Sequence, residues 1–344
     1  MVVLLGFLIF AFLVNSFLLI PFINLLYKLR FQRKKQKTRD IFLRLTPIFD
    51  KFHRQKAGTP VGGGVLIITT TIILFFFSLL IFRYFWLPVT SVYPLKIEIK
   101  ILIFTFLSFG LLGLYDDIKK TFPGMTDIGF GLRFFQKLFL EIILALIISF
   151  WLFRDLEIGV VNLPFFKPID LGIFFVPFAS FVIVSFANAF NISDGLDGLA
   201  AGLLMIALAA FWIISASILD TPLSTFIALW LGGLIAFLYF NVYPARIFLG
   251  DVGALSFGAT FAVIGLLLGK TFALVVIGGL FVIEAASSLI QILGKRYLKR
   301  KILKVAPLHL WLQEIGWEEP KIVTRAWLAG IILAFLGLFL AMIR

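Results

Sequence analysis

The stretch VPFASFVIVSFANAFNISDGLDGLAAGLLMIALAAFWIIS, from Val176 to Ser215, contains two long apolar runs separated by one short polar turn. Together with the neighbouring apolar residues, at 171–190 and 198–217, each run reaches the length of about 20 residues that a helix needs to cross the apolar core of a bilayer. The turn between the runs carries two carboxylates, Asp194 and Asp197. Because ionisable groups at a membrane boundary are costly, the sequence marks this turn as a candidate functional site.

The apolar pattern extends over the whole chain of 344 residues. Hydrophobic residues make up 61% of it and charged residues 14%, and the mean hydropathy is +1.09. An apolar segment in lipid must satisfy its own backbone hydrogen bonds, so we predict one all-α integral membrane domain, residues 1–344, with no cleaved leader. About ten transmembrane helices are expected, at residues 2–27, 62–82, 99–115, 134–153, 171–190, 198–217, 223–240, 252–269, 272–294 and 323–343.

The basic residues lie mainly in alternate loops. Of 31 Lys and Arg, 11 fall between Lys28 and Lys56 and seven between Lys295 and Lys321. Positive charge accumulates on the cytoplasmic side of membrane proteins, so the odd-numbered loops should be cytoplasmic and the N- and C-termini should both lie outside. These cytoplasmic loops are expected at about residues 28–61, 116–133, 191–197, 241–251 and 295–322.

The net charge of +13 is therefore mainly a signal of topology. The run KRYLKRK, Lys295 to Lys301, is expected to contact anionic lipid headgroups. Nucleic-acid binding is disfavoured because no basic region is interleaved with exposed aromatic residues.

Five carboxylates fall on the same predicted face as the basic loops: Asp116, Asp117, Asp194, Asp197 and Asp251. Crowded carboxylates repel one another strongly at low dielectric, and a divalent cation with lysines nearby would keep them ionised. Oxygen ligands in a chain without cysteine favour Mg²⁺, or Mn²⁺, over zinc. Each aspartate alone could be a helix cap or turn residue, but three acidic groups on one face favour a shared metal or phosphate site.

Six strings at these loops and in the ninth span form a wider pattern. They are KAGTPVGGG (56–64), DDIKK (116–120), NISDGLDGLA (191–200), NVYPARIFLGDVGA (241–254), FVIEAASSLIQ (281–291) and APLHLWLQEIGWEEPKIVTRAW (306–327). In this order they resemble the polyprenyl-phosphate N-acetylhexosamine-1-phosphate transferases, and within them the branch that makes lipid I.

The resemblance implies a reaction, two substrates and a location. Phospho-MurNAc-pentapeptide would pass from UDP-MurNAc-pentapeptide to undecaprenyl phosphate, giving lipid I and UMP for peptidoglycan synthesis. The enzyme would be Mg²⁺-dependent and would lie in the bacterial cytoplasmic membrane, with its active site facing the cytoplasm. A homodimer is a further possibility that the resemblance leaves open.

The resemblance also implies roles for residues. Asp251 would be the metal ligand, and Asp116 and Asp117 would flank the prenyl phosphate while Lys120 offsets charge. The residues implied to be catalytic are Asp116, Asp117, Asp251 and His309. The residues implied to bind substrate are Lys56, Thr59, Lys120, Asn191, Asp194, Asp197 and Asn241.

The last loop departs from the pattern of the resembled family. Where that family has three consecutive histidines, this chain has His309, Leu310 and Trp311, and Gln313 replaces the usual Glu. Two alternatives therefore stay open: a UDP-GlcNAc:polyprenyl-phosphate transferase, and a weakened paralogue with a binding role. An ion-coupled transporter is disfavoured, because its carboxylates should lie near the bilayer midplane and its halves should repeat. Glu284, deep in a span, is expected to face the bundle interior beside a hydrogen-bond partner.

Overall fold

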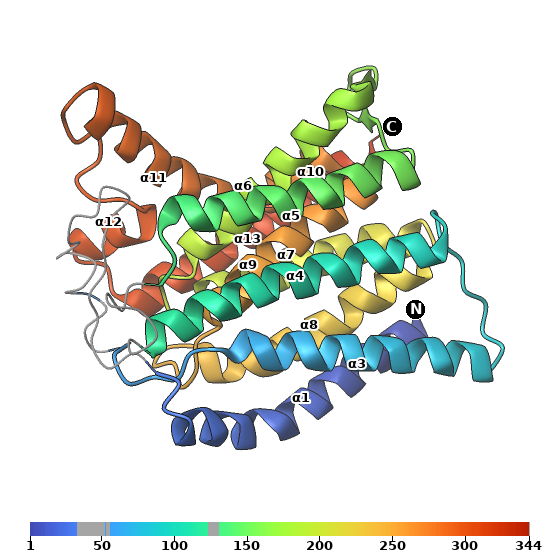
Figure 1. The fold of residues 1–344 in the computed structure, drawn as a ribbon, viewed down its shortest axis with the longest axis horizontal. Coiled ribbons are helices and arrows are strands. Elements are labelled where there is room, and N and C mark those ends of the chain that lie inside the picture. Colours follow the sequence, from blue (N-terminus) through green and yellow to red (C-terminus); the bar gives the residue numbers. More distant parts are fainter. Residues whose placement is uncertain (33–51, 53–55, 123–130, 344) are drawn as a thin grey trace.

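The computed structural model describes residues 1–32, 52, 56–122 and 131–343. These residues form a bundle of long helices that lie side by side (Figure 1). The helices are α1 (Val2–Lys28), α3 (Gly63–Tyr84), α4 (Leu95–Thr121), α5 (Phe134–Asp155), α6 (Phe175–Ser193), α7 (Leu199–Ser217), α8 (Thr221–Asn241), α9 (Gly250–Leu267), α10 (Thr271–Ile277), α11 (Gly279–Tyr297), α12 (Leu308–Glu314) and α13 (Glu319–Met342).

Nine candidate spans in the described part of the chain are long and apolar enough to cross a membrane, and up to ten if α10 and α11 form one bent span. The prediction of an all-helical membrane bundle with about ten spans is thus confirmed in its coarse form. The ninth span predicted at residues 272–294 is divided in the structure, because α10 and α11 meet there at an angle of 78°.

Two adjacent glycines account for this break. A side chain at Gly278 would lie 2.7 Å from the ring of Phe186 and 3.0 Å from the carbonyl oxygen of Leu274. A glycine pair is a usual site for a sharp helix kink, and the close packing of Phe186 leaves no room for another residue there. Beyond Gly279, α11 leaves the bundle and projects from it (Figure 1).

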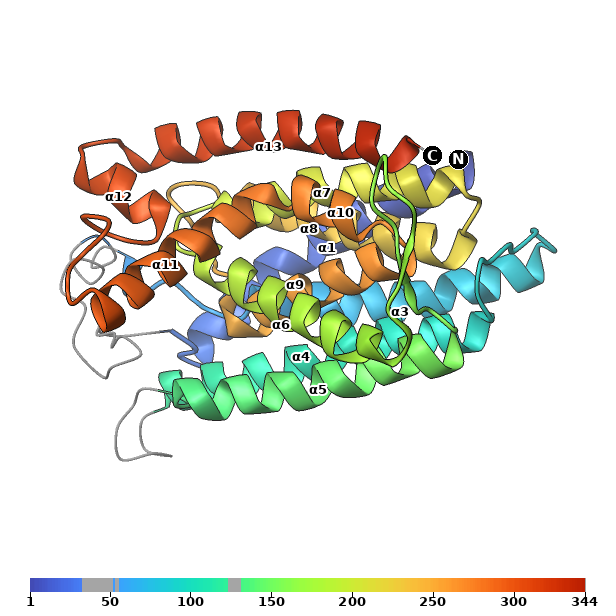
Figure 2. The same cartoon turned by 90° about the horizontal axis from the view of Figure 1, so that it is seen from above.

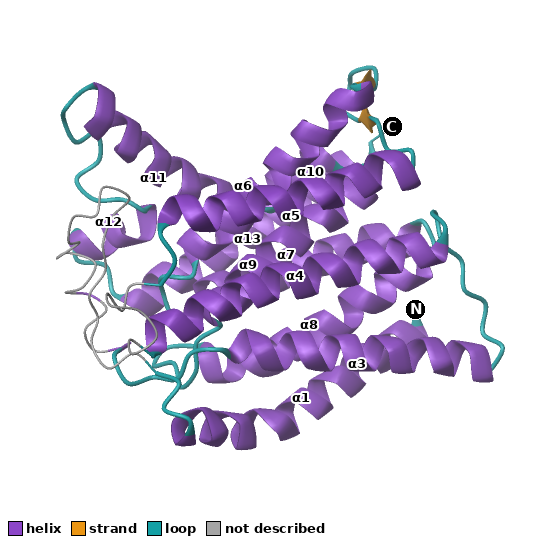
Figure 3. Ribbon diagram, in the orientation of Figure 1, coloured by secondary structure: helices purple, strands orange, loops and turns teal. Residues whose placement is uncertain are grey.

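A small hairpin lies at the end of the bundle where α5 finishes. Its strands β1 (Val160–Val161) and β2 (Ile169–Asp170) pair antiparallel, with Val160 opposite Asp170. The 3₁₀ turn η3 (Gly172–Phe174) follows and leads into α6. The two strands of the hairpin are drawn in orange in Figure 3. The sequence analysis predicted only helices and did not include this hairpin.

Helix α9 lies at the centre of the bundle, between α4, α6 and α3 (Figure 2). Its neighbours approach closely because small residues face one another. A side chain at Gly113 of α4 would lie 2.1 Å from the carbonyl oxygen of Asp251, and one at Gly64 of α3 would lie 2.4 Å from Gly253. Membrane helices often use such small residues to bring their backbones together.

Several predicted loops are shorter in the structure. Asp116 and Asp117 lie in the final turns of α4, Asn191 lies in α6, Asn241 ends α8 and Asp251 lies in the first turn of α9. Because these residues are polar, the sequence predicted that they lie in loops. In the structure the helices include them, since the side chains find polar partners or solvent at the end of the bundle. Most of the first predicted loop and residues 123–130 of the third lie outside the described residues.

The contact between α4 and α9 can be tested with two glycines of α4. Gly113→Ala should lower the free energy of unfolding by about 1–3 kcal/mol, because its methyl group meets backbone atoms of Asp251 that cannot easily move. Gly110→Ala should cost less than about 1 kcal/mol, because it meets the flexible end of Ile68 at 2.9 Å. Thermal unfolding in detergent measures both, and equal losses would contradict this account of the packing.

Candidate functional site

Four charged side chains from three helices form the first polar group, the ionic cluster of Asp116, Lys120, Lys137 and Asp251. Lys120 Nζ lies 2.8 Å from Asp116 Oδ2 and 2.7 Å from Asp251 Oδ2. Lys137 Nζ lies 2.6 Å from Asp251 Oδ2 and 3.3 Å from Asp116 Oδ2. Two lysines therefore bridge two aspartates, and the four charges sum to zero.

Backbone groups position the aspartates at the end of α4. Asp116 Oδ1 accepts a hydrogen bond of 2.7 Å from the Leu132 N–H, and Asp117 Oδ2 accepts one of 3.0 Å from the Val252 N–H. The second bond places a carboxylate at the N-terminus of α9, where the helix dipole stabilises negative charge. Gly250 has φ +77° and lies so close to Asp117 that a side chain there would stand 2.5 Å from Oδ2.

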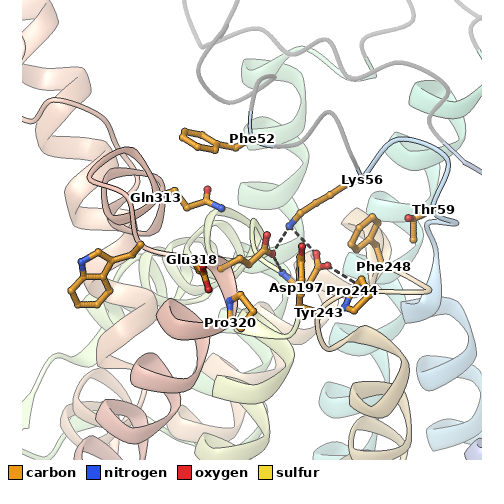
Figure 4. A pocket seen from close by; sticks show the side chains of 13 residues that line it. Phe52, Lys56, Thr59, Asp197, Tyr243, Pro244, Phe248, Gln313, Glu318 and Pro320 are labelled. Carbon is orange, nitrogen blue, oxygen red and sulfur yellow. Dashed lines mark hydrogen bonds and ion pairs between the residues drawn. The ribbon is translucent and has the colours of Figure 1, made fainter.

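The second polar group, the Lys56 cluster, consists of Lys56, Asp197 and Glu319 (Figure 4). Lys56 Nζ lies 2.7 Å from Asp197 Oδ1 and 2.6 Å from Glu319 Oε1, and it donates a hydrogen bond of 3.2 Å to the Gly195 carbonyl. The Asp197 N–H donates to Glu319 Oε1 at 2.5 Å, and its Oδ2 accepts from the Ala245 N–H at 2.9 Å. The cluster thus joins the first loop, the 194–198 turn and the start of α13.

A cavity of about 730 Å³ opens beside the Lys56 cluster. Figure 4 shows its lining, which combines charged, amide and aromatic side chains with two prolines. The residues that carry its chemistry are Lys56, Thr59, Asp197, Tyr243, Pro244, Phe248, Gln313 and Glu319. Gln313 Oε1 is buried and has no hydrogen-bond partner in the described part of the chain.

Asp194 connects the two clusters electrostatically. Burial raises the pKa of Asp194 to about 7, and the negative charge of Asp251 adds to the increase. Lys56 opposes that increase, while Asp117 contributes to it. Asp194 therefore interacts with charged groups of both clusters, and negative charge is in excess around it.

His309 is buried on α12 and held by Glu284 of α11. Its backbone N–H donates to Glu284 Oε1 at 3.2 Å, and Nδ1 lies 3.1 Å from Glu284 Oε2. A carboxylate at Nδ1 places a proton on that nitrogen and fixes the orientation of the ring. Nε2 has no hydrogen-bond partner among the described residues and points at Gly195, where a side chain would lie 2.4 Å away. Glu284 is buried and has a hydrogen-bond partner, as expected from the sequence, although this partner belongs to α12.

Asn241 and Asn191 lie at helix ends beside these groups. Asn241 Nδ2 donates to the Ile247 carbonyl at 2.9 Å, and Oδ1 accepts from the Gly198 N–H at 3.2 Å. The buried Asn241 amide thus holds the 242–249 loop against the 194–198 turn. Asn191 lies in the last turn of α6 and is partly exposed.

Comparisons with known proteins were made over the whole chain. A family model described as glycosyl transferase family 4 matches residues 99–269. A phospho-N-acetylmuramoyl-pentapeptide-transferase of Borrelia turicatae is 35% identical over 285 residues, which is 77% of this chain and 79% of the relative. The protein of that name from Borreliella burgdorferi strain ZS7 is 35% identical over 84% of each chain, and the one from Thermodesulfovibrio yellowstonii is 37% identical over 86% of this chain and 83% of its own.

This chain belongs to the phospho-N-acetylmuramoyl-pentapeptide-transferase family. The resemblance inferred from the six strings of sequence is thereby confirmed. Within this family, the aspartates and lysines of the ionic cluster become candidates for handling phosphate groups.

The three positions of the last loop that depart from the resembled family, Leu310, Trp311 and Gln313, lie on α12. Leu310 is buried, and Trp311 is partly buried. Neither lines the cavity, whereas Gln313, one turn further along the helix, does. In this member of the family, α12 therefore carries His309 and Gln313 but lacks the second and third histidines of the resembled pattern.

Two charged residues of the site were missed from the sequence. Lys137 lies near the start of the predicted fourth span, where a lysine among apolar residues is costly and could have been flagged. Glu319 lies in the string GWEEPK, where nothing in the local pattern distinguishes it from Glu318. Only the folded chain brings Glu319 to Lys56.

Those neighbouring glutamates supply a matched test of the Lys56 cluster. Glu319→Gln should lower the free energy of unfolding by about 1–3 kcal/mol, because it leaves Lys56 with one carboxylate in a poorly hydrated place. Glu318→Gln should change stability by less than about 0.5 kcal/mol, because Glu318 is exposed. Thermal unfolding of both variants measures these changes. Equal losses of stability in the two variants would refute the role given to Glu319.

Proposed function

We propose that this protein transfers phospho-MurNAc-pentapeptide from UDP-MurNAc-pentapeptide to undecaprenyl phosphate, releasing UMP and forming lipid I. The observation that carries the proposal is the ionic cluster, in which Lys120 and Lys137 bridge Asp116 and Asp251 at one end of a membrane bundle. Membership of the phospho-N-acetylmuramoyl-pentapeptide-transferase family supports the choice of donor and acceptor.

The reaction joins two anions, so the protein must first offset their repulsion. Lys120 and Lys137 bring two positive charges to one place, and a phosphate could take over their contacts from Asp116 and Asp251. A phosphate monoester is largely ionised near neutral pH, so the attacking oxygen needs little help from a general base. Asp116 and Asp117 would therefore act mainly by orienting the lysines and the acceptor.

A divalent cation fits this arrangement. Among the described residues no three carboxylate or imidazole groups are arranged to hold a metal, but Mg²⁺ usually takes only one or two protein carboxylates and keeps several waters. The excess negative charge around Asp194 favours such an ion. Asp251 would hold it, with Asp117 or Asp194 as a second oxygen donor. When bound, Mg²⁺ would neutralise pyrophosphate charge and stabilise the leaving UMP.

The cavity beside the Lys56 cluster suits the nucleotide part of a UDP-sugar. Carboxylates such as Asp197 and Glu319 accept hydrogen bonds from ribose hydroxyls, and Tyr243 and Phe248 supply flat apolar surface for a base. Gln313 adds an amide that can both donate and accept. His309 would act through Nε2, which points at the turn that carries Asp194 and Asp197.

We place this end of the bundle in the cytoplasm of a bacterial cell, at its cytoplasmic membrane. The loops at this end carry most of the basic residues, which favours that orientation. The exposed basic residues at the end of α11 and just after it, from Lys295 to Lys301, would contact anionic headgroups there.

The substrates are tested by incubating the purified protein with undecaprenyl phosphate, Mg²⁺ and one UDP-sugar at a time. UMP release should occur with UDP-MurNAc-pentapeptide and exceed that with UDP-GlcNAc by at least about 100-fold, because the family acts on the former and an enzyme can separate such donors by several kcal/mol. Release with UDP-GlcNAc alone would favour the related GlcNAc-1-phosphate transfer. Release with neither donor would reject the proposal.

In the same assay, Asp251→Asn should lower UMP release by about 100-fold or more, because it removes the proposed metal ligand and one anchor of both lysines. The matched control is Asp170→Asn, an exposed aspartate at the opposite end of the bundle, which should leave turnover unchanged. Near-normal turnover of Asp251→Asn would remove Asp251 from the site.

The orientation is tested with single cysteines, since the sequence has none of its own. In intact cells, a membrane-impermeant thiol reagent should label Lys167→Cys at the hairpin and should label Lys301→Cys only after permeabilisation. Both positions are exposed and lie at opposite ends of the bundle. Labelling of Lys301→Cys in intact cells would reverse the proposed orientation.

A further inference from the structure

Two carboxyl groups are buried together at the end of the bundle away from the ionic cluster. Glu98 lies in the first turn of α4 and is 0% exposed, and Asp220 caps the N-terminus of α8 and is 2% exposed. In the described part of the chain neither forms an ion pair with a lysine or arginine; Lys100 of α4 pairs with Asp155 instead. Two ionised carboxylates buried side by side without a cation would be strongly unfavourable.

The hydrogen bonds around the two groups differ in kind. Asp220 accepts from the Leu223 N–H at 3.2 Å and from the Val92 N–H, as an ionised carboxylate does. Glu98 Oε2 accepts a bond of 2.7 Å from the Ser91 hydroxyl. Glu98 Oε1 is buried and receives no donor from any described residue, and the Glu98 carboxyl is hydrogen-bonded to the Asp220 carboxyl.

A carboxyl oxygen can bond to another carboxylate only if it carries a proton. Asp220 already has two backbone donors, so the proton belongs on Glu98, which has one oxygen without a donor among the described residues. We propose that Glu98 and Asp220 share one proton, and that this pair is a pH-sensitive latch between the α3–α4 and α7–α8 loops.

The loops that the latch joins are also tied by backbone bonds. The Thr221 N–H donates to the Thr90 carbonyl at 2.8 Å, and the Thr90 N–H donates to Thr221 Oγ1 at 3.2 Å. The other titratable group that faces the pair is Tyr93, whose hydroxyl pKa is raised by burial and by the charges of Glu98 and Asp220. Tyr93 therefore stays neutral while the carboxyl pair titrates.

The sign of the pH dependence follows from burial. The shared proton titrates from the pair as a whole, because both carboxyl groups are buried and a charge on one disfavours a charge on the other. Burial accordingly raises the pKa of Asp220 above the value of an unfolded aspartate, although hydrogen bonds from Leu223 and Val92 oppose this. A group whose pKa is higher in the folded state contributes stability at low pH that is lost as the pH rises through the folded-state value. Losing the shared proton leaves two negative charges facing each other, so the latch weakens in alkaline solution.

The test is thermal unfolding of the purified protein in detergent between about pH 5.5 and pH 9. The Tm of the wild type should fall by about 2–5 °C more than that of Glu98→Gln over this range. Glutamine keeps both hydrogen bonds, because its amide donates to Asp220 and accepts from Ser91, but it does not titrate. The control is Asp155→Asn, which removes an ion pair near the same end of the bundle. Its Tm should fall over this pH range by as much as that of the wild type.

Infrared difference spectroscopy supplies a readout that does not depend on unfolding. The wild type should show a protonated-carboxyl band that is missing from Glu98→Gln and that disappears as the pH is raised. Equal Tm losses in wild type and Glu98→Gln, or the same carboxyl bands in both, would overturn the proposal. A chelator that lowers the Tm of the wild type but not of Glu98→Gln would also overturn it, by indicating a bound cation instead of a proton. None of these results depends on the proposed transferase activity.

Discussion

The structure of the candidate site depends on charge neutralisation within an apolar bundle. Asp116 and Asp251 come from different helices, and each is stabilised by the same two ammonium groups, from Lys120 and Lys137. This bridging requires α4, α5 and α9 to keep a fixed separation, and the close approach of Gly113 to the backbone of Asp251 maintains it between α4 and α9. The packing of the membrane helices therefore sets the distances between the charged groups of the site.

Much of the fold follows from hydropathy, because a segment that enters lipid has few alternatives to a helix. The expected helical bundle is present, but two details depend on tertiary contacts. The bend at Gly278 lies in a uniformly apolar window, and Phe186, far away in sequence, occupies the space that a side chain would need. Helix ends were misjudged at Asp116 and Asn191, because polar residues suggest loops when the partners that accept them are unknown.

The candidate site could be outlined from the sequence but not completed. The six strings identify the segments that meet, since each carries charged or amide residues in a strongly apolar chain. They do not say which partner each side chain takes. Lys137 was missed because its contact with Asp251 spans 114 residues of sequence, and Glu319 because its contact with Lys56 spans 263. The amide of Asn241 binds backbone groups of two segments.

The Lys56 cluster also has a consequence for the order in which the protein is made. Its lysine belongs to the first connection of the chain, its aspartate to the middle, and Glu319 opens the last long helix. During synthesis from the N-terminus, the wall of the cavity is thus completed only when the final segment arrives. A nascent or truncated polypeptide that stops before α13 has most of the helices inserted, yet it lacks a finished pocket.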